Sequence, residues 1–198
     1  MTTLVTMRAA VRQDLRDTDA AGYKWTDEEL DRHLQRALAD YTQVAPLMAT
    51  TTVVAGASAS YDLSATPGWL WCERVEYPLD GRPRATVIFE EVVRGQVTLL
   101  DEALPSVGEN VRFWYAKEHT LDAVSSTVPY EDEPLLVLGA VAYALLAYAD
   151  YAIGRVGVSY RDPGDYRELG LAREQEFAAR LDLLRRSTGW TGRLVSWG

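Results

Sequence analysis

The chain has 198 residues, a single cysteine, Cys72, and a formal net charge of -9 at pH 7. This length suits one domain, or a core with one subdomain, and one cysteine excludes an internal disulfide or a cysteine-rich zinc site. The acidic balance argues against a protein that holds nucleic acid by neutralising phosphates, and because the sequence shows no signal segment or lipidation motif we expect a soluble, cytoplasmic chain with protein partners.

Two amphipathic helices are predicted at the start of the chain. The first, from Thr2 or Thr3 to Arg16, has apolar residues three or four positions apart, namely Leu4, Met7, Val11 and Leu15. In the second, Thr26 and Glu29 have the spacing of a capping box, and Trp25 and Leu30 that of a hydrophobic staple. This helix should end before Pro46, and the short loop between the helices predicts an antiparallel pair.

From about Thr50 to His119, short β-branched or alternating runs are separated by turns rich in Gly and Pro. They predict five or six strands in a small antiparallel sheet or barrel-like subdomain inserted between helical segments. The runs TTTVVAG and ASYDLS suggest a hairpin. In WLWCERVEYP, strict alternation would place Trp71 and Val75 on one face and Cys72 on the other.

A buried central helix is predicted from Pro134 to Gly154. Acidic residues precede it, which suits the positive end of a helix dipole, and no charged side chain occurs between Leu135 and Ala149. Fifteen such residues span roughly 22 Å, less than the roughly 30 Å of a bilayer core, so we do not expect a membrane span. A stripe of small residues and a tyrosine is the predicted packing surface between subunits: Ala140, Ala144, Ala147 and Tyr151.

A last amphipathic helix is expected from about Gly164 to Arg186, followed by the segment STGWTGRLVSWG. This segment has two Trp residues and no acid, and it is too small to form its own core. It could be a disordered end, pack on its own subunit, or lie as an arm in a groove of a neighbour. The predicted partner-interface residues are Arg186, Trp190, Arg193, Leu194, Val195 and Trp197.

Little in the sequence points to catalysis or to a cofactor. His33 and His119 have no second ligand at metal-binding spacing, and the acidic runs at 27–29 and 131–133 lie at helix starts, where the dipole favours them. GxSxG, Walker and GxGxxG motifs are absent from the sequence. We therefore predict no catalytic residues, no metal site and no cofactor, and an enzyme is the least favoured class.

The order of these parts resembles tailed-bacteriophage head-tail adaptor proteins, also called connector or head-completion proteins. The similarity is carried by MRAAVRQDLRD, WTDEELDRHLQRALADYTQVAP, the β insertion with YDLS, and STVPYEDEPLLVLGAVAYALL followed by an amphipathic helix and a tail. The resemblance implies a non-enzymatic virion protein of the neck, assembled from subunits made in the host cytoplasm. It implies a homo-oligomeric ring, usually a dodecamer, that joins the portal protein to the tail or stopper protein while DNA passes through without specific binding.

The expected fold is α+β, a bundle of about four helices with an inserted antiparallel β subdomain and an extended C-terminal tail. The predicted parts are a helical pair at 1–48, the β insertion at 49–120, the remaining helices at 121–186 and the arm at 187–198. By the resemblance, the arm would reach the portal. The rival interpretation is a carbohydrate- or peptide-binding module with an aromatic platform exposed on one face, formed by Trp69, Trp71, Trp114 and Tyr115.

Overall fold

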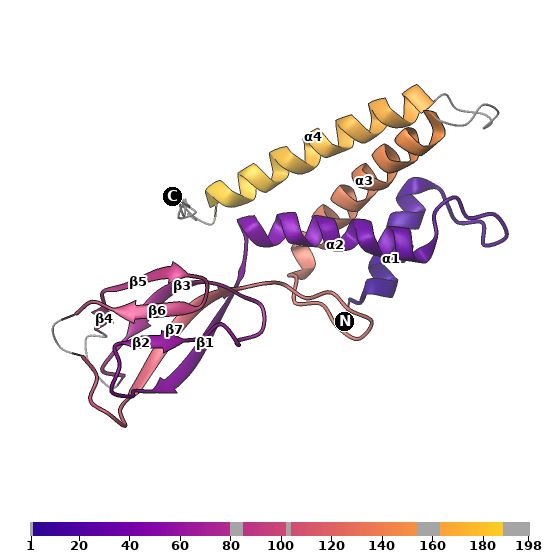
Figure 1. Cartoon of the computed structure of the whole chain (residues 1–198). Helices are drawn as coiled ribbons and strands as arrows, with labels where there is room; N and C mark the ends of the chain where they lie inside the picture. The colour runs from indigo at the N-terminus through magenta and orange to yellow at the C-terminus, as the bar shows by residue number, and fades with distance from the viewer. Residues whose placement is uncertain (1, 80–84, 102–103, 154–162, 188–198) are drawn as a thin grey trace. The chain divides into compact units, whose positions relative to one another are not determined.

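The computed structural model describes residues 2–79, 85–101, 104–153 and 163–187, and it confirms the predicted α+β fold (Figure 1). The chain divides into two compact units. A helical unit contains the residues up to Ala45 and those from His119 onward, and a β unit runs from Pro46 to Glu118. Each unit has its own hydrophobic core.

Local capping starts the first two helices of the helical unit. Helix α1 spans Leu4–Leu15 and α2 spans Asp27–Val44. Thr26 Oγ1 accepts the N–H of Glu29 at 3.2 Å, and the Glu29 carboxylate accepts the N–H of Thr26 at 2.8 Å. This reciprocal pair is the predicted capping box, and it satisfies backbone donors that a helix start leaves free. Thr3 caps α1 in the same way together with Thr6.

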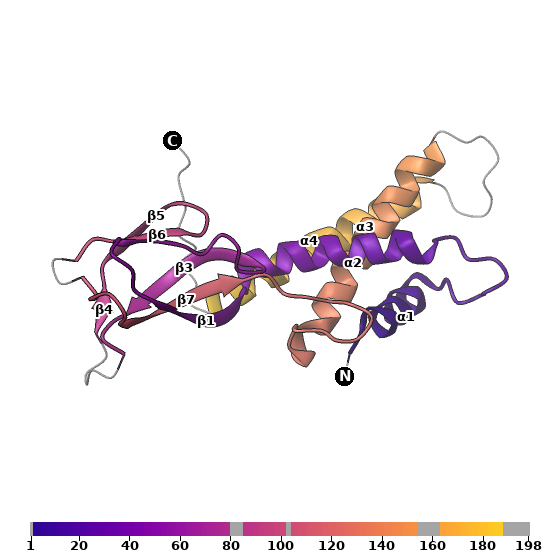
Figure 2. The same cartoon turned by 60° about the horizontal axis from the view of Figure 1, so that its bottom comes forward.

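Helix α3, Glu133–Ile153, forms the centre of the helical unit. It follows a short 3-10 turn, η1 at Tyr130–Asp132, and packs against α1, α2 and α4, which spans Pro163–Ser187 (Figures 1 and 2). The helical stretch Tyr130–Ala152 is long and apolar enough to cross a membrane, judged by length and composition. However, 72% of its apolar 18-residue segment is buried inside the protein. Most of the apolar surface of α3 is therefore covered by the protein's own helices.

Gly139 lets three helices meet closely. A Cβ atom at this position would lie 2.8 Å from Cζ of Phe177 on α4 and 3.0 Å from Cβ of Ala37 on α2. Phe177 and Ala37 are both fully or almost fully buried. Because Gly139 has no side chain, the Phe177 ring can fill the space beside it.

The β unit consists of two antiparallel sheets (Figure 2). A four-stranded sheet has the order β1-β7-β3-β4, with β1 at Leu47–Val54, β7 at Asn110–Lys117, β3 at Trp69–Glu76 and β4 at Thr86–Val87. A three-stranded sheet has the order β2-β6-β5, with β2 at Ser60–Asp62, β6 at Gln96–Leu99 and β5 at Phe89–Val93. Their facing side chains form one core, which includes Val75, Val97 and Phe113.

Two expectations for this region were wrong. The runs on either side of Gly56 and Ala57 do not form a hairpin, because β1 pairs with β7 and β2 pairs with β6. In β3, irregularities between Trp69 and Trp71 and between Cys72 and Arg74 break the alternation. Trp69, Cys72 and Val75 consequently share the buried side, since each bulge shifts the following residues to the other face.

Candidate interaction surfaces

The predicted packing stripe of α3 is divided by the fold. Ala140 and Ala144 are completely buried inside the helical unit, so α3's neighbours in the same chain already cover them. Ala147 is exposed and Tyr151 is 54% exposed. They line a cleft of about 440 Å³ between the start of α2 and the end of α3, together with residues such as Lys24 and Tyr148. A contact with another subunit on this stripe is therefore possible only at its C-terminal half.

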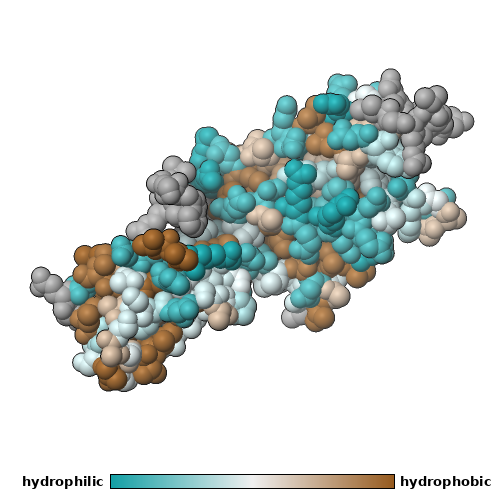
Figure 3. All heavy atoms as spheres, viewed as in Figure 1, coloured by the Kyte–Doolittle hydropathy of each residue, from teal (hydrophilic) through white to brown (hydrophobic). Residues whose placement is uncertain are grey.

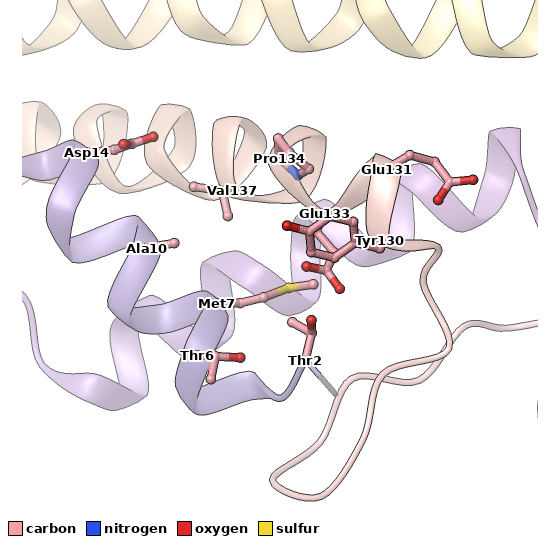
Figure 4. Close-up of a pocket in the computed structure, with 10 residues that line it drawn as sticks. All are labelled: Thr2, Thr6, Met7, Ala10, Asp14, Tyr130, Glu131, Glu133, Pro134 and Val137. Carbon is pink, nitrogen blue, oxygen red and sulfur yellow. The ribbon is translucent and has the colours of Figure 1, made fainter.

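A groove of about 450 Å³ lies between α1 and the start of α3 (Figure 4). Its apolar lining comes from Met7, Ala10 and Val137, of which Met7 and Val137 are nearly buried. Carboxylates lie around this floor, and the ring of Tyr130 is 81% exposed beside them. The acidic lining residues are Asp14, Glu131 and Glu133. The apolar floor of the groove suits an apolar segment of a partner. Its acidic border favours a segment that also carries basic side chains.

The acidic residues at the start of α2 form ion pairs with α1. Arg12, only 7% exposed, donates to Asp17 at 2.7 Å and to Asp27 at 2.6 Å. Asp27 also pairs with Arg8. The hydrogen bond from Arg12 lowers the pKa of the Asp27 carboxyl. Sequence analysis missed this network, because nothing in the helical spacing of Arg12 shows that it reaches across the loop to Asp17.

Both histidine side chains are buried in the interior of the protein. The Nε2 atom of His119 lies 2.9 Å from the carbonyl oxygen of Ala45, and Nδ1 lies 3.0 Å from Thr127 Oγ1. Burial lowers the pKa of both His119 and His33. In the described ranges, no group of three or more His, Cys, Asp or Glu residues is placed to hold a metal ion.

The carboxylate of Glu91 joins the two sheets of the β unit. Glu91 on β5 accepts the indole N–H of Trp69 at 2.8 Å, the backbone N–H of Cys72 at 2.5 Å and that of Gly95 at 2.7 Å. These donors come from β3 and from the turn after β5. Glu91 thus fixes β5 against β3, which is a structural role.

The four aromatic residues of the rival binding module do not form one exposed platform. Trp69 and Tyr115 are 1% and 6% exposed, and their rings stack in the core with centroids 4.4 Å apart. Trp71 and Trp114 are half-buried on the opposite, outer face of the four-stranded sheet. There Arg74 covers the Trp114 ring, 4.4 Å from its centroid. The condition for that interpretation is therefore not met.

Large aliphatic side chains reach the surface of the β unit (Figure 3, brown). Ile88 and Leu100 are 66% and 53% exposed and are adjacent, since the N–H of Leu100 donates to the carbonyl of Ile88 at 2.8 Å. The other large hydrophobic side chains described in this unit that are more than half exposed are Val54, Val92, Val93 and Val107. Adjacent exposed aliphatic side chains, such as Ile88 and Leu100, are more typical of a protein-binding surface than side chains exposed singly.

Most of the predicted C-terminal interface lies outside the described residues. These are Trp190, Arg193, Leu194, Val195 and Trp197. Arg186 is described, at the end of α4, where its exposed guanidinium pairs with Asp182 at 2.5 Å. An exposed pair of this kind contributes little to stability, so Arg186 can exchange Asp182 for another acidic partner.

No protein-family model matches this chain, and no curated protein matches it. One similar solved structure is the neck of an empty gene transfer agent (GTA) particle computed with C6 symmetry, with 14% identity, a TM-score of 0.32, and coverage of 85% of this chain and 88% of that one. A second is the virion of a native GTA particle, with 15% identity, a TM-score of 0.32, and coverage of 85% and 91%.

A third similar structure is the neck of a native GTA particle computed with C12 symmetry, with 13% identity, a TM-score of 0.30, and coverage of 86% and 92%. The matched chains are thus of similar length to this one and come from the neck or virion of such particles. TM-scores in this range do not establish a shared fold, so the chain's own residues carry its functional interpretation.

Proposed function

We propose that the chain is a structural, non-enzymatic subunit of the neck of a tailed phage or phage-like particle. In this role it forms a ring that joins the portal to the tail or stopper protein and extends the DNA channel. The observation that carries the proposal is the pair of adjacent, exposed aliphatic side chains Ile88 and Leu100 in the β unit. Covering such side chains with another protein is favourable, because it removes apolar surface from water.

The polar groups of the described residues support a scaffold more than a catalyst. Arg12, Asp17 and Asp27 are engaged with one another, and Glu91 accepts three hydrogen bonds within the β unit. The net charge of -9 also suits a channel that DNA must pass, because an acidic wall repels phosphates.

Two further contacts belong to the proposal. Ala147 and Tyr151 are its inter-subunit packing residues on α3, where the cleft beside α2 leaves room for a neighbour. Arg186 and the arm that follows are its contact with a partner. Closure of a ring requires two different surfaces on each copy, and the exposed site on α3 supplies one of them.

The test is attachment of the full chain to purified portal rings, measured by co-sedimentation and by negative-stain imaging before and after the tail or stopper protein is added. We expect an added ring on the portal. The substitution Ile88→Asp should weaken binding of this chain to the portal, or to the tail or stopper protein, at least tenfold. Val5→Asp is the matched control, because Val5 is similarly exposed, at 55%, but lies on α1. Failure of the full chain to bind either the portal or the tail side would refute the proposal.

A further inference from the structure

Strand β1 is the one long edge among the described strands that has no protection against pairing with another chain. It is at the end of the order β1-β7-β3-β4 and has eight residues, whereas the opposite edge strand β4 has two. In the other sheet, edge strand β2 has three residues, and edge strand β5 carries Glu90 and Glu91 and an irregularity before Val93. Short length, charge and bulges are the usual means of blocking an edge, and β1 has none of them.

The backbone groups that β1 presents outward can be assigned from its pairing. The N–H of Ala55 donates to the carbonyl of Glu109 at 2.7 Å, which continues the register Val54↔Asn110. Because hydrogen-bonded positions alternate in an antiparallel ladder, the odd-numbered residues of β1 bond to β7 and the even-numbered residues point away. The outward N–H and C=O groups therefore belong to Met48, Thr50, Thr52 and Val54.

The side chains of β1 favour the addition of a strand. Its sequence LMATTTVV contains no charge, no Gly and no Pro, and five of its residues are β-branched. The side chains of the outward-bonding residues are all exposed. Within the described part of the chain, β1 pairs with β7 alone. An edge with this composition is a template for an extended segment, which would gain main-chain hydrogen bonds and cross-strand contacts.

The C-terminal segment of the chain contains a run with the alternation of a strand. Residues 188–198 follow α4, carry no acid, and include the run RLVSW, in which Arg193, Val195 and Trp197 alternate with Leu194 and Ser196. Eight paired residues occupy about 27 Å, and eleven extended residues reach about 36 Å, so the segment is long enough to cover β1.

We propose that residues 188–198 of one copy add to the free edge of β1 on a neighbouring copy as an extra strand. The inference rests on the proposed ring, in which one surface of each subunit meets a different surface of the next. It identifies the surface that the C-terminal arm binds as the backbone of β1, with Trp197 and Val195 as side chains that pack beside it.

The first experiment mixes a synthetic peptide of residues 188–198 with the chain ending at Ser187, which retains every described residue of both cores. Residue-resolved hydrogen exchange should show the amides of Met48, Thr50, Thr52 and Val54 slowed at least tenfold by the peptide. The odd-numbered amides should be protected with or without it. Equal exchange of the even-numbered amides at saturating peptide would overturn the inference.

Variants of Thr52 separate the backbone contact from the side-chain contact. Thr52→Pro removes one outward N–H and no bond to β7, and Pro is tolerated on an edge strand, so it should lower peptide affinity at least tenfold with little change in melting temperature. Thr52→Val keeps the N–H and should bind as the wild type does. Unchanged affinity of Thr52→Pro would overturn the inference. If that variant does not fold, the exchange measurement on the wild-type sequence still decides.

The full chain identifies which copy supplies the segment. Protection of the even-numbered amides should increase with protein concentration or on assembly. Protection that is complete in dilute monomer would mean that the segment folds back on its own copy, which contradicts the proposal. Rings that form with these amides unprotected would refute this inference and leave the proposed function intact, whereas absence of rings with peptide binding retained would refute the proposed function alone.

Discussion

The imidazole Nε2 atom of His119 lies 2.9 Å from the carbonyl oxygen of Ala45. Ala45 is the last residue of the helical unit before the β insertion, and His119 is the first residue after it. The bond therefore joins the two chain segments through which the β unit is inserted. On the β-unit side, the same two segments are paired as Leu47↔Lys117.

The burial of His119 makes stability depend on pH in a defined direction, and the bond to Ala45 opposes part of this effect. Burial lowers the pKa of His119 below its ordinary value of 6.5, so the unfolded chain takes up a proton at a higher pH than the folded one. The contribution is complete above pH 6.5 and is lost as pH falls from there through the lowered pKa. We expect denaturant midpoints that are constant from pH 8 to 7 and that decrease between pH 6.5 and 5.

His119→Gln should reduce that slope, by up to about 1.4 kcal/mol per pH unit for one proton. His33, whose pKa is also lowered by burial, should supply the remaining share. A slope below pH 6.5 that is identical in His119→Gln and wild type would show that His119 is not coupled to folding.

Removal of the Arg12 guanidinium should strongly destabilise the helical unit. Arg12→Met leaves the carboxylate of Asp17, whose side chain is 4% exposed, without its ionic partner. Breaking a buried pair in this way costs about 3–5 kcal/mol, which chemical unfolding would measure. Arg180→Met is the control, because Arg180 forms an exposed pair with Glu176 and its loss should change stability by less than about 1 kcal/mol. Equal effects of the two variants would contradict a structural role for Arg12.

Gly139→Val should separate helices that now touch. The added atoms would occupy the space of the Phe177 ring, whose Cζ atom is 2.8 Å from the position that a Cβ atom would take at residue 139. Overpacking in a dense core typically reduces stability by about 1–3 kcal/mol. We expect a loss above this range here, measured as a decrease in melting temperature, because α2 and α4 both have to move. Gly22→Ala is the matched control in the same unit, since its nearest neighbour is an Asp19 oxygen at 3.9 Å. A Gly139→Val protein as stable as wild type would refute the close contact.

Glu91→Ala should loosen the two sheets of the β unit. It removes the acceptor for Trp69, Cys72 and Gly95, and each unsatisfied buried donor costs about 1–3 kcal/mol. Acrylamide quenching of tryptophan fluorescence should increase, because the Trp69 indole loses its partner and its core position. Glu90→Ala changes the neighbouring, exposed carboxylate and should leave quenching unchanged. No difference between these two variants would mean that Glu91 does not hold the sheets together.

The sequence by itself determined the elements whose causes are local. The start of α2 was predicted from Thr26 and Glu29, because a capping box involves residues three positions apart. The burial of α3 was predicted from its uncharged stretch, since a helix without a polar face has to be covered. Turns containing Gly and Pro also located the β insertion.

Only the tertiary structure decided which elements cover one another. Strand β1 pairs with β7, more than fifty residues away in the chain, and its flanking residues contain no signal for that choice. The same holds for Ala140 and Ala144, which are buried by helices of their own chain, and for Trp69 and Tyr115, which stack in the core. Spacing along a chain defines the faces of an element, whereas the free energy of burying a face depends on every other element that can reach it.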